Sequence, residues 1–471
     1  MMDTALVYDA TGEQAQSWAF HNSLNDDQLH EVIMVRAIVK DLDIRSMEKS
    51  IESVIRRHDA FRTFFRMTHG DLKQCVVGYD KEMFSPFYCD MTSIGDRDGM
   101  ISGINDIINK FKHSIRRLDS PPLVRSCIFK VTDDSHYLCI LIHHIISDQR
   151  SAVLIYEEIG RVYQQLREGN AVHPEPPGAQ LRDYALWQRK WLKEEGDNTS
   201  RFWKIKLKDV LGTLDPTEWY RQYRRLSGFP VENNDSAGPV TREIVLDILK
   251  KKKAASYYHS IGLPEYRPLT ELSLKCKTNI CSVITVSLQL LFYLLAGKKT
   301  ILIAMPVTSR RFFGADSIIG CIGGAIYLYR AVNEDLPVKD FIEEGYLDFL
   351  ESSQNLIFDH EQMGLDGQML RINCDVFINF VNKEIIGVEQ PPEISYKLHQ
   401  PLEKSVFYAS TYTIREYEDG FSCSWKYNLN LYTPERIAFM VETHEAILRA
   451  ICLQPEMTIR ELMCRIKRPF N

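Results

Sequence analysis

The sequence predicts a mixed α/β protein with two lobes. Apolar strand patterns alternate with helical patterns in both halves of the chain, and a proline-rich stretch, NAVHPEPPGAQ at 170–180, separates the halves. A chain of 471 residues that is 45% hydrophobic is also long enough to bury more than one core. We therefore expect an N-terminal lobe over residues 1–178 and a C-terminal lobe over residues 179–471.

Strand and helix signals follow one another through the first half. Ile44, Met47 and Ile51 recur at helical spacing, and the turn sequence TDDS separates the last two strand patterns. Strands are predicted at 30–41, 61–67, 72–79, 123–131 and 135–142. Helices are predicted at 44–61, 103–115 and 151–169.

The second half contains one segment that resembles a membrane span, NICSVITVSLQLLFYLLAG at 279–297. It includes Ser, Thr and Gln, and the apolar strand pattern TILIAMPV follows at once, so a buried helix is favoured over a span. The stretch at 209–240 is polar and irregular. Further strands are predicted at 300–307, 374–382 and 420–428, and a helix at 433–451.

The net charge and the cysteine pattern argue against a nucleic-acid-binding protein and against a secreted, disulfide-bonded one. The formal net charge of −6 gives no basic footprint for nucleic acid. The eleven cysteines are an odd number without any CxxC pair, which favours a reduced compartment. The N-terminus has no basic and apolar signal region. We expect a cytoplasmic protein that binds neither membrane nor nucleic acid.

The stretch CILIHHIISDQRS, residues 139–151, places His143 and His144 at the end of an apolar strand. Adjacent residues on extended backbone point to opposite sides, and no HExxH or CxxC accompanies them, so no metal site is expected. One histidine facing a cleft could position or deprotonate a nucleophile. On spacing alone, a hydrogen-bonded pair in the core is the equal alternative. Asp148 is expected to begin or cap the next helix, and a buried carboxylate there needs a partner such as arginine.

The same stretch resembles the HHxxxDG signature of the condensation domains of nonribosomal peptide synthetases, which belong with the chloramphenicol acetyltransferase-like acyltransferases. Five further segments resemble the family's motifs in the expected order along some 400 residues. They are RHDAFRTFF at 57–65, LRDYALWQ at 181–188, TILIAMPVTSR with IIGCIGGAIYLYR at 300–330, VFINFVN at 376–382 and YTPERIAFMVETHEAILRAI at 432–451.

The resemblance implies two chloramphenicol acetyltransferase-like lobes in a V-shaped pseudo-dimer with a central tunnel. Matched position by position, His144 is the cleft-facing histidine, and His143 supports it from the core. Asp148 is structural, with Arg310 as its ion-pair partner. Two further residues match positions that hold the architecture, namely Arg62 and Trp187.

The function implied is that of a free-standing condensation enzyme of nonribosomal peptide or hybrid polyketide biosynthesis. It would transfer an acyl group from the phosphopantetheine thioester of an acyl or peptidyl carrier protein, acting in trans, to an amine or hydroxyl acceptor. No permanently bound cofactor is implied, and a monomer is expected. Two alternatives stay open: an acyl-CoA-dependent acyltransferase of the same superfamily, and a catalytically silent module that recruits carrier proteins.

Some positions depart from the family's pattern. Gln149 and Arg150 follow the aspartate where glycine and commonly tryptophan stand, and Gly324 occupies the position of an asparagine. Ser151 is followed by alanine, whereas epimerisation domains have Ser-Trp. We expect Gln149, Ser151 and Gly324 to line the tunnel, so that its shape is suited to an unusual substrate.

Overall fold

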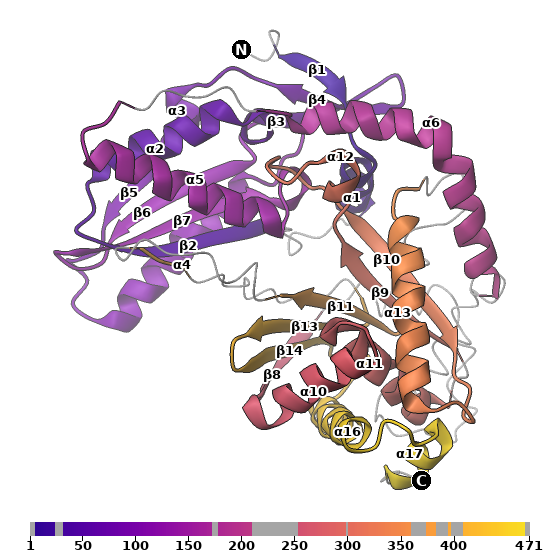
Figure 1. Ribbon diagram of the computed structural model, residues 1–471. Helices are drawn as coiled ribbons and strands as arrows, with labels where there is room; N and C mark the ends of the chain where they lie inside the picture. The colour runs from indigo at the N-terminus through magenta and orange to yellow at the C-terminus, as the bar shows by residue number, and fades with distance from the viewer. Residues whose placement is uncertain are drawn as a thin grey trace, which may run out of the picture. The chain divides into compact units, whose positions relative to one another are not determined.

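The computed structural model describes residues 5–23, 32–171, 178–209, 253–297, 300–358, 374–382, 394–396 and 408–466. The chain forms two compact units, shown in Figure 1. The first unit comprises Met1–Lys193, Thr308–Gly323 and Gly387–Glu403. The second unit comprises Glu194–Val307, Gly324–Ile386 and Lys404–Asn471.

These units do not coincide with the predicted lobes 1–178 and 179–471. Helix α6 (Leu181–Lys206) continues without a break past Lys193, where the first unit's first segment ends. The segment Thr308–Gly323 belongs to the first unit although it lies far along the chain. Its apolar side chains explain this, because Ala315, Ile318, Ile319 and Ile322 are buried in that unit's core. The central part of the proposed linker, 172–177, lies outside the described residues, as does nearly all of the stretch 209–240.

A five-stranded sheet organises the first unit, in the order β12-β2-β7-β6-β5. All neighbours are antiparallel except β5 and β6, which are parallel. The strands are β2 (Val32–Lys40), β5 (Phe87–Asp90), β6 (Val124–Lys130), β7 (Ser135–His143) and β12 (Ile394–Tyr396). The helices beside this sheet are α2 (Ile44–Arg57), α4 (Arg97–Ser114) and α5 (Gln149–Arg167).

Strand β7 is apolar from Leu138 to Ile142 because both faces of its sheet are covered there. Leu138, Ile140 and Ile142 pack into the cluster that contains α2 and α5, whereas Cys139 and Leu141 pack into the cluster that contains α4. Figure 1 shows α2 and α5 on one side of the sheet and α4 on the other. Successive side chains of a strand point to opposite faces, so two buried faces require an unbroken apolar run.

The rest of the first unit consists of a smaller sheet and several further helices and turns. A three-stranded sheet has the order β1-β4-β3 with antiparallel pairing. Its strands are β1 (Leu6–Asp9), β3 (Thr63–Thr68) and β4 (Asp71–Val76). The remaining helices and turns are α1 (Gly12–Ser23), η2 (Asp59–Arg62), α3 (Lys81–Phe84), η3 (His144–Ile146) and α12 (Arg310–Phe313).

The second unit contains a six-stranded mixed sheet in the order β10-β9-β11-β13-β14-β8. Its strands are β8 (Ala254–Ile261), β9 (Thr300–Val307), β10 (Gly324–Ala331), β11 (Val376–Val381), β13 (Ser410–Tyr417) and β14 (Gly420–Asn428). Helices pack against it: α10 (Leu263–Lys275), α11 (Ile280–Ala296), α13 (Val338–Gln354) and α16 (Pro434–Leu453). The short α17 (Ile459–Arg465) follows α16.

Helix α11 is the apolar segment that resembled a membrane span. Its side chains are mostly buried against the sheet and the neighbouring helices, including the polar Ser287 and Gln289. In the described part of the chain, no single helix is long and apolar enough to cross a membrane. Helices α10 and α11 meet those criteria only as a pair, and they are bent by 101°.

A buried histidine makes the stability of the second unit depend on pH. His444 of α16 is fully buried, and its Nε2 lies 2.7 Å from Ser287 Oγ of α11. Burial, together with the nearby His259, lowers the pKa of His444 to about 3. His444 is therefore neutral in the folded protein at any pH above that value.

We predict that acid destabilises the second unit through His444. The pKa of His444 falls from 6.5 in the unfolded chain to about 3 in the folded one. This contribution to stability is complete above pH 6.5 and is lost as the pH falls toward 3. Each pKa unit corresponds to about 1.4 kcal/mol, so the loss should approach about 5 kcal/mol as the pH nears 3.

Urea unfolding between pH 4 and 8 measures this effect. The variant His444→Gln should show a flatter dependence of unfolding free energy on pH. The matched control is His113→Gln on α4, where the imidazole is exposed and its Nδ1 bonds to the Asn109 carbonyl one turn earlier. Equal slopes in His444→Gln and the wild type would contradict the prediction.

Candidate functional site

The two adjacent histidines lie where β7 ends and the short turn of 3₁₀ helix η3 begins. His143 is the last residue of β7 and is only 2% exposed, whereas His144 is exposed. The residues that follow, Ile145 and Ile146, are completely buried. The backbone on both sides of His144 is therefore anchored in the core while its imidazole remains accessible.

His143 supports this turn from the inside. Its Nδ1 accepts a hydrogen bond from the Ile145 N–H at 3.1 Å, and its carbonyl accepts one from Ser147 Oγ at 3.2 Å. Its ring also contacts the ring of His21 on α1, edge to face, with centroids 5.7 Å apart. These contacts fit the supporting role that the sequence predicts for His143.

Asp148 and Arg310 form the ion pair that the sequence predicts. Asp148 is the N-cap of α5, and its carboxylate accepts the Ser151 N–H at 2.7 Å. Arg310 Nη2 lies 2.9 Å from both oxygens of the same carboxylate. The Ile322 N–H donates a fourth bond at 3.2 Å. Asp148 is partly buried, and a carboxylate with this many donors is fully compensated.

The guanidinium of Arg310 also organises the segment that carries it. Arg310 is 2% exposed, and its Nη1 donates to the carbonyls of Ala315 at 2.7 Å and Ile318 at 2.6 Å. These bonds curl residues 310–318 around the charge. One side chain thus fixes both the shape of the segment and its attachment to the start of α5.

Ser151 belongs to this hydrogen-bond network and does not face an open cavity. Its side chain is completely buried, and its Oγ lies 2.7 Å from the Asp148 carboxylate. The same Oγ lies 3.0 Å from the Gly320 carbonyl and accepts the Gly320 N–H at 3.0 Å. The expectation that Ser151 lines a tunnel is therefore not met, because its hydroxyl is buried and hydrogen-bonds α5 to the 308–323 segment.

Two of the departures from the family's pattern, Gln149 and Gly324, belong to different units. Gln149, the first residue of α5, is partly exposed, and its buried Nε2 has no hydrogen-bond partner among the described residues. Gly324 begins β10 in the second unit, where an added Cβ would lie 3.3 Å from Leu356 Cδ1. The contact with Leu356 leaves little room for a side chain at this position. Their proposed place along a tunnel stays a prediction.

The two residues expected to hold the architecture both make such contacts. Arg62 Nη1 donates to the Val77 carbonyl at 2.6 Å, and its Nη2 pairs with Asp59 at 2.7 Å. Trp187 of α6 packs against Phe313 of α12, with ring centroids 5.5 Å apart. Trp187 thereby adds an aromatic contact to the attachment of the 308–323 segment.

Sequence reasoning missed one neighbour of His144. The Sγ of Cys321 lies 3.7 Å from His144 Nδ1. The two residues are separated by 177 positions, so no local spacing could have revealed the contact. Only the position of Cys321, directly before the residue whose N–H binds Asp148, connects it to the motif.

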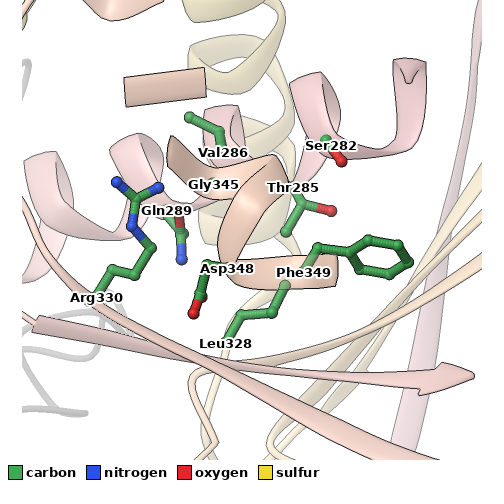
Figure 2. A pocket seen from close by; sticks show the side chains of 9 residues that line it. All are labelled: Ser282, Thr285, Val286, Gln289, Leu328, Arg330, Gly345, Asp348 and Phe349. Carbon is green, nitrogen blue, oxygen red and sulfur yellow. The ribbon is translucent and has the colours of Figure 1, made fainter. Parts of the chain in front are cut away.

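The second unit contains a pocket that is lined by residues outside the predicted site. It lies between α11, β10 and α13, and Figure 2 shows Gln289, Arg330 and Asp348 gathered at one side of it. The pKa of Asp348 is raised by burial, and Lys206 forms an ion pair with it. None of the predicted site residues lines this pocket. Among the described residues, no group of three or more His, Cys, Asp or Glu side chains is arranged to hold a metal ion.

We predict that Asp148→Ala destabilises the protein by about 3–5 kcal/mol, because it leaves the buried charge of Arg310 uncompensated. Asp148→Asn should retain most of this loss, since asparagine is as good an N-cap but carries no charge. Urea unfolding measures both variants. In the control Glu52→Ala, which breaks an exposed pair with Arg56, the loss should stay below about 0.5 kcal/mol. A loss of about 1 kcal/mol in Asp148→Ala would fit a helix cap alone and would contradict a stabilising ion pair.

The sequence is similar to a protein-family model and to two large synthases. The family model described as "Condensation domain" matches residues 6–236. The chain is 22% identical over 433 residues to gramicidin S synthase 2 of Brevibacillus brevis, covering 89% of this chain but 9% of the synthase. It is also 22% identical over 431 residues to bacitracin synthase 1 of Bacillus licheniformis, covering 90% of this chain and 7% of that protein. The chain thus spans less than a tenth of these relatives' length.

Solved structures of condensation-type domains share the fold of this protein over nearly the whole chain. The condensation domain of the monacolin K polyketide synthase MokA matches with a TM-score of 0.76 and 15% identity, covering 97% of this chain and 99% of that one. The X-domain from teicoplanin biosynthesis matches with a TM-score of 0.72 and 16% identity, covering 96% of both chains. The predicted fold class is confirmed as the mixed α/β fold of condensation domains, which have two chloramphenicol acetyltransferase-like lobes; the V shape and the tunnel stay predictions. The signature around His144, the family model over residues 6–236 and the relatives agree, and the chain is similar to the condensation domains of nonribosomal peptide synthetases.

Proposed function

We propose that this protein transfers an acyl group from a carrier-protein thioester to an amine or hydroxyl acceptor. The observation that carries the proposal is the accessible imidazole of His144 on a turn whose neighbours are buried. A histidine held in this way can act on a substrate without moving its backbone. The relatives are peptide antibiotic synthases by name, and their chemistry of amide formation is the model for this proposal.

The reaction requires positioning more than strong acid–base chemistry. A thioester is an activated acyl donor, and a neutral amine is already a good nucleophile. Holding the two reactants in contact can lower the barrier by about 7–11 kcal/mol. For an amine, His144 needs only to orient the nucleophile and accept a proton as the tetrahedral intermediate forms or collapses. For an alcohol, a true general base would contribute more, because a hydroxyl is a weaker nucleophile.

The donor in this proposal arrives on a phosphopantetheine arm. The arm is a cosubstrate attached to an acyl or peptidyl carrier protein, so the protein itself would hold no permanent cofactor. The acceptor would be an amine or alcohol, free or itself carrier-bound, in nonribosomal peptide or hybrid polyketide biosynthesis. His143, Asp148 and Arg310 would support the site without touching substrate, since their side chains bond to protein groups.

A recruitment module is the second candidate. Gln149 and Gly324 replace residues typical of the family, and one solved structure of similar fold is a complex of the teicoplanin X-domain with OxyB. The accessible His144 and the intact Asp148–Arg310 pair favour catalysis, because a binding platform has no need of an accessible imidazole.

We predict that His144→Ala slows acyl transfer by about 10²–10⁴-fold while the protein melts like the wild type. Acyl-loaded carrier proteins are mixed with amine and alcohol acceptors, and the products are followed by mass spectrometry. His113→Ala, which removes another exposed imidazole of the first unit, is the control and should leave the rate unchanged.

The outcomes of this experiment separate the candidates. Unchanged turnover in His144→Ala would exclude His144 as the catalytic residue. Transfer from acyl-CoA without any carrier protein would favour the acyl-CoA-dependent alternative. Carrier binding with no transfer by the wild type would favour the recruitment module.

A further inference from the structure

Cys321 lies beside the histidine to which the proposed function assigns the chemistry, and the inference drawn from it rests on that function. Its Sγ is 3.7 Å from His144 Nδ1, within the range of a hydrogen bond that involves sulfur. Cys321 is partly exposed and is not in a disulfide. Both residues belong to the first unit.

The backbone holds Cys321 in place from both sides. The preceding Gly320 is fixed by bonds of its N–H and carbonyl to Ser151 Oγ, each at 3.0 Å. The following Ile322 is 1% exposed and donates its N–H to Asp148. The sulfur therefore projects from a segment that the buried ion pair fixes, and its position is set independently of any substrate.

His144 is held equally firmly. His143 on one side and Ile145 on the other are buried, and a hydrogen bond joins them. The imidazole can still rotate about its own side-chain bonds, so the backbone alone does not decide which nitrogen faces outward. The contact with Cys321 supplies the missing constraint, because it engages Nδ1. Among the described residues, Nε2 of His144 has no hydrogen-bond partner.

We propose that Cys321 is a positioning residue for His144. The Nδ1–H donates to Sγ, which leaves the lone pair of Nε2 directed to the acceptor nucleophile. The hydrogen bond made by one ring nitrogen sets the state of the other, so the thiol selects the tautomer that can take up a proton. A sulfur atom is a weak acceptor, and unlike a carboxylate it places no negative charge beside the ring. Cys321 thus orients the imidazole without a counter-ion.

Nitrogen NMR of the imidazoles tests the proton arrangement without any substrate. In wild-type protein at pH 8, the His144 signals should show a protonated Nδ1 and an unprotonated Nε2, assigned by their loss in His144→Gln. In Cys321→Ala, the two nitrogens should move toward the averaged values of exchanging tautomers. Cys321→Ser keeps a hydrogen-bonding atom and should restore much of the wild-type pattern. The control Cys464→Ala, at an exposed cysteine of the second unit, should leave these signals unchanged.

Kinetics with the acyl-loaded carrier protein provide the second measurement. Cys321→Ala should lower kcat by about 10–100-fold, as is typical when an orienting partner of a functional histidine is removed, with KM for the donor unchanged. Cys321→Ser should retain more of kcat. If Cys321→Ala fails to fold, Cys321→Val provides the same comparison with a residue that fills the space of the thiol.

Two results would overturn the proposal. Unchanged nitrogen shifts in Cys321→Ala would overturn it even if kcat fell, because a structural disturbance would then be enough to explain the lower kcat. Unchanged kcat with altered shifts would show that the contact has no role in the reaction. If the wild-type protein transfers no acyl group, the proposed function fails, while the NMR comparison still decides whether the sulfur sets the tautomer.

Discussion

The ion pair of the buried Arg310 with the partly buried Asp148 is the interaction on which the rest of the site depends. Its two charges come from segments that are 162 positions apart. The carboxylate caps α5, and the guanidinium shapes the segment that follows it. Burying either charge alone would cost several kcal/mol, so the two segments are stable only together. Together with the buried apolar side chains of the segment, this constraint explains why residues 308–323 pack with the first unit rather than with the strand that precedes them.

The pair also explains the environment of the histidines. Asp148 follows η3 after one residue, Ser147, and its bond to the Ile322 N–H places Cys321 opposite that turn. The core provides the other support, because β7 delivers His143 into a buried position and leaves His144 at its end. Charge compensation and apolar packing thus act on the same few residues, and the only histidine of the motif left accessible is the one to which we assign the chemistry.

Such a division of roles suits the transfer of an acyl group from a thioester. The reaction gains most from holding two reactants in contact, so a weakly assisted imidazole in a rigid setting is sufficient. Gln149 stands where the family has glycine, at the first turn of α5 and within the same motif. A side chain at this position is the natural candidate for adjusting which acceptor the site admits.

The sequence by itself determined the order of most elements and the residues of the central motif. The apolar run of β7, the strand end at the two histidines and the capping by Asp148 follow from local periodicity and side-chain chemistry. The pairing with Arg310 followed from the family resemblance. Only the tertiary structure decided which unit contains residues 308–323, that Ser151 is enclosed, and that Cys321 meets His144. These facts depend on contacts between residues more than 150 positions apart, and no spacing rule along a chain specifies which distant segment fills a given part of the core.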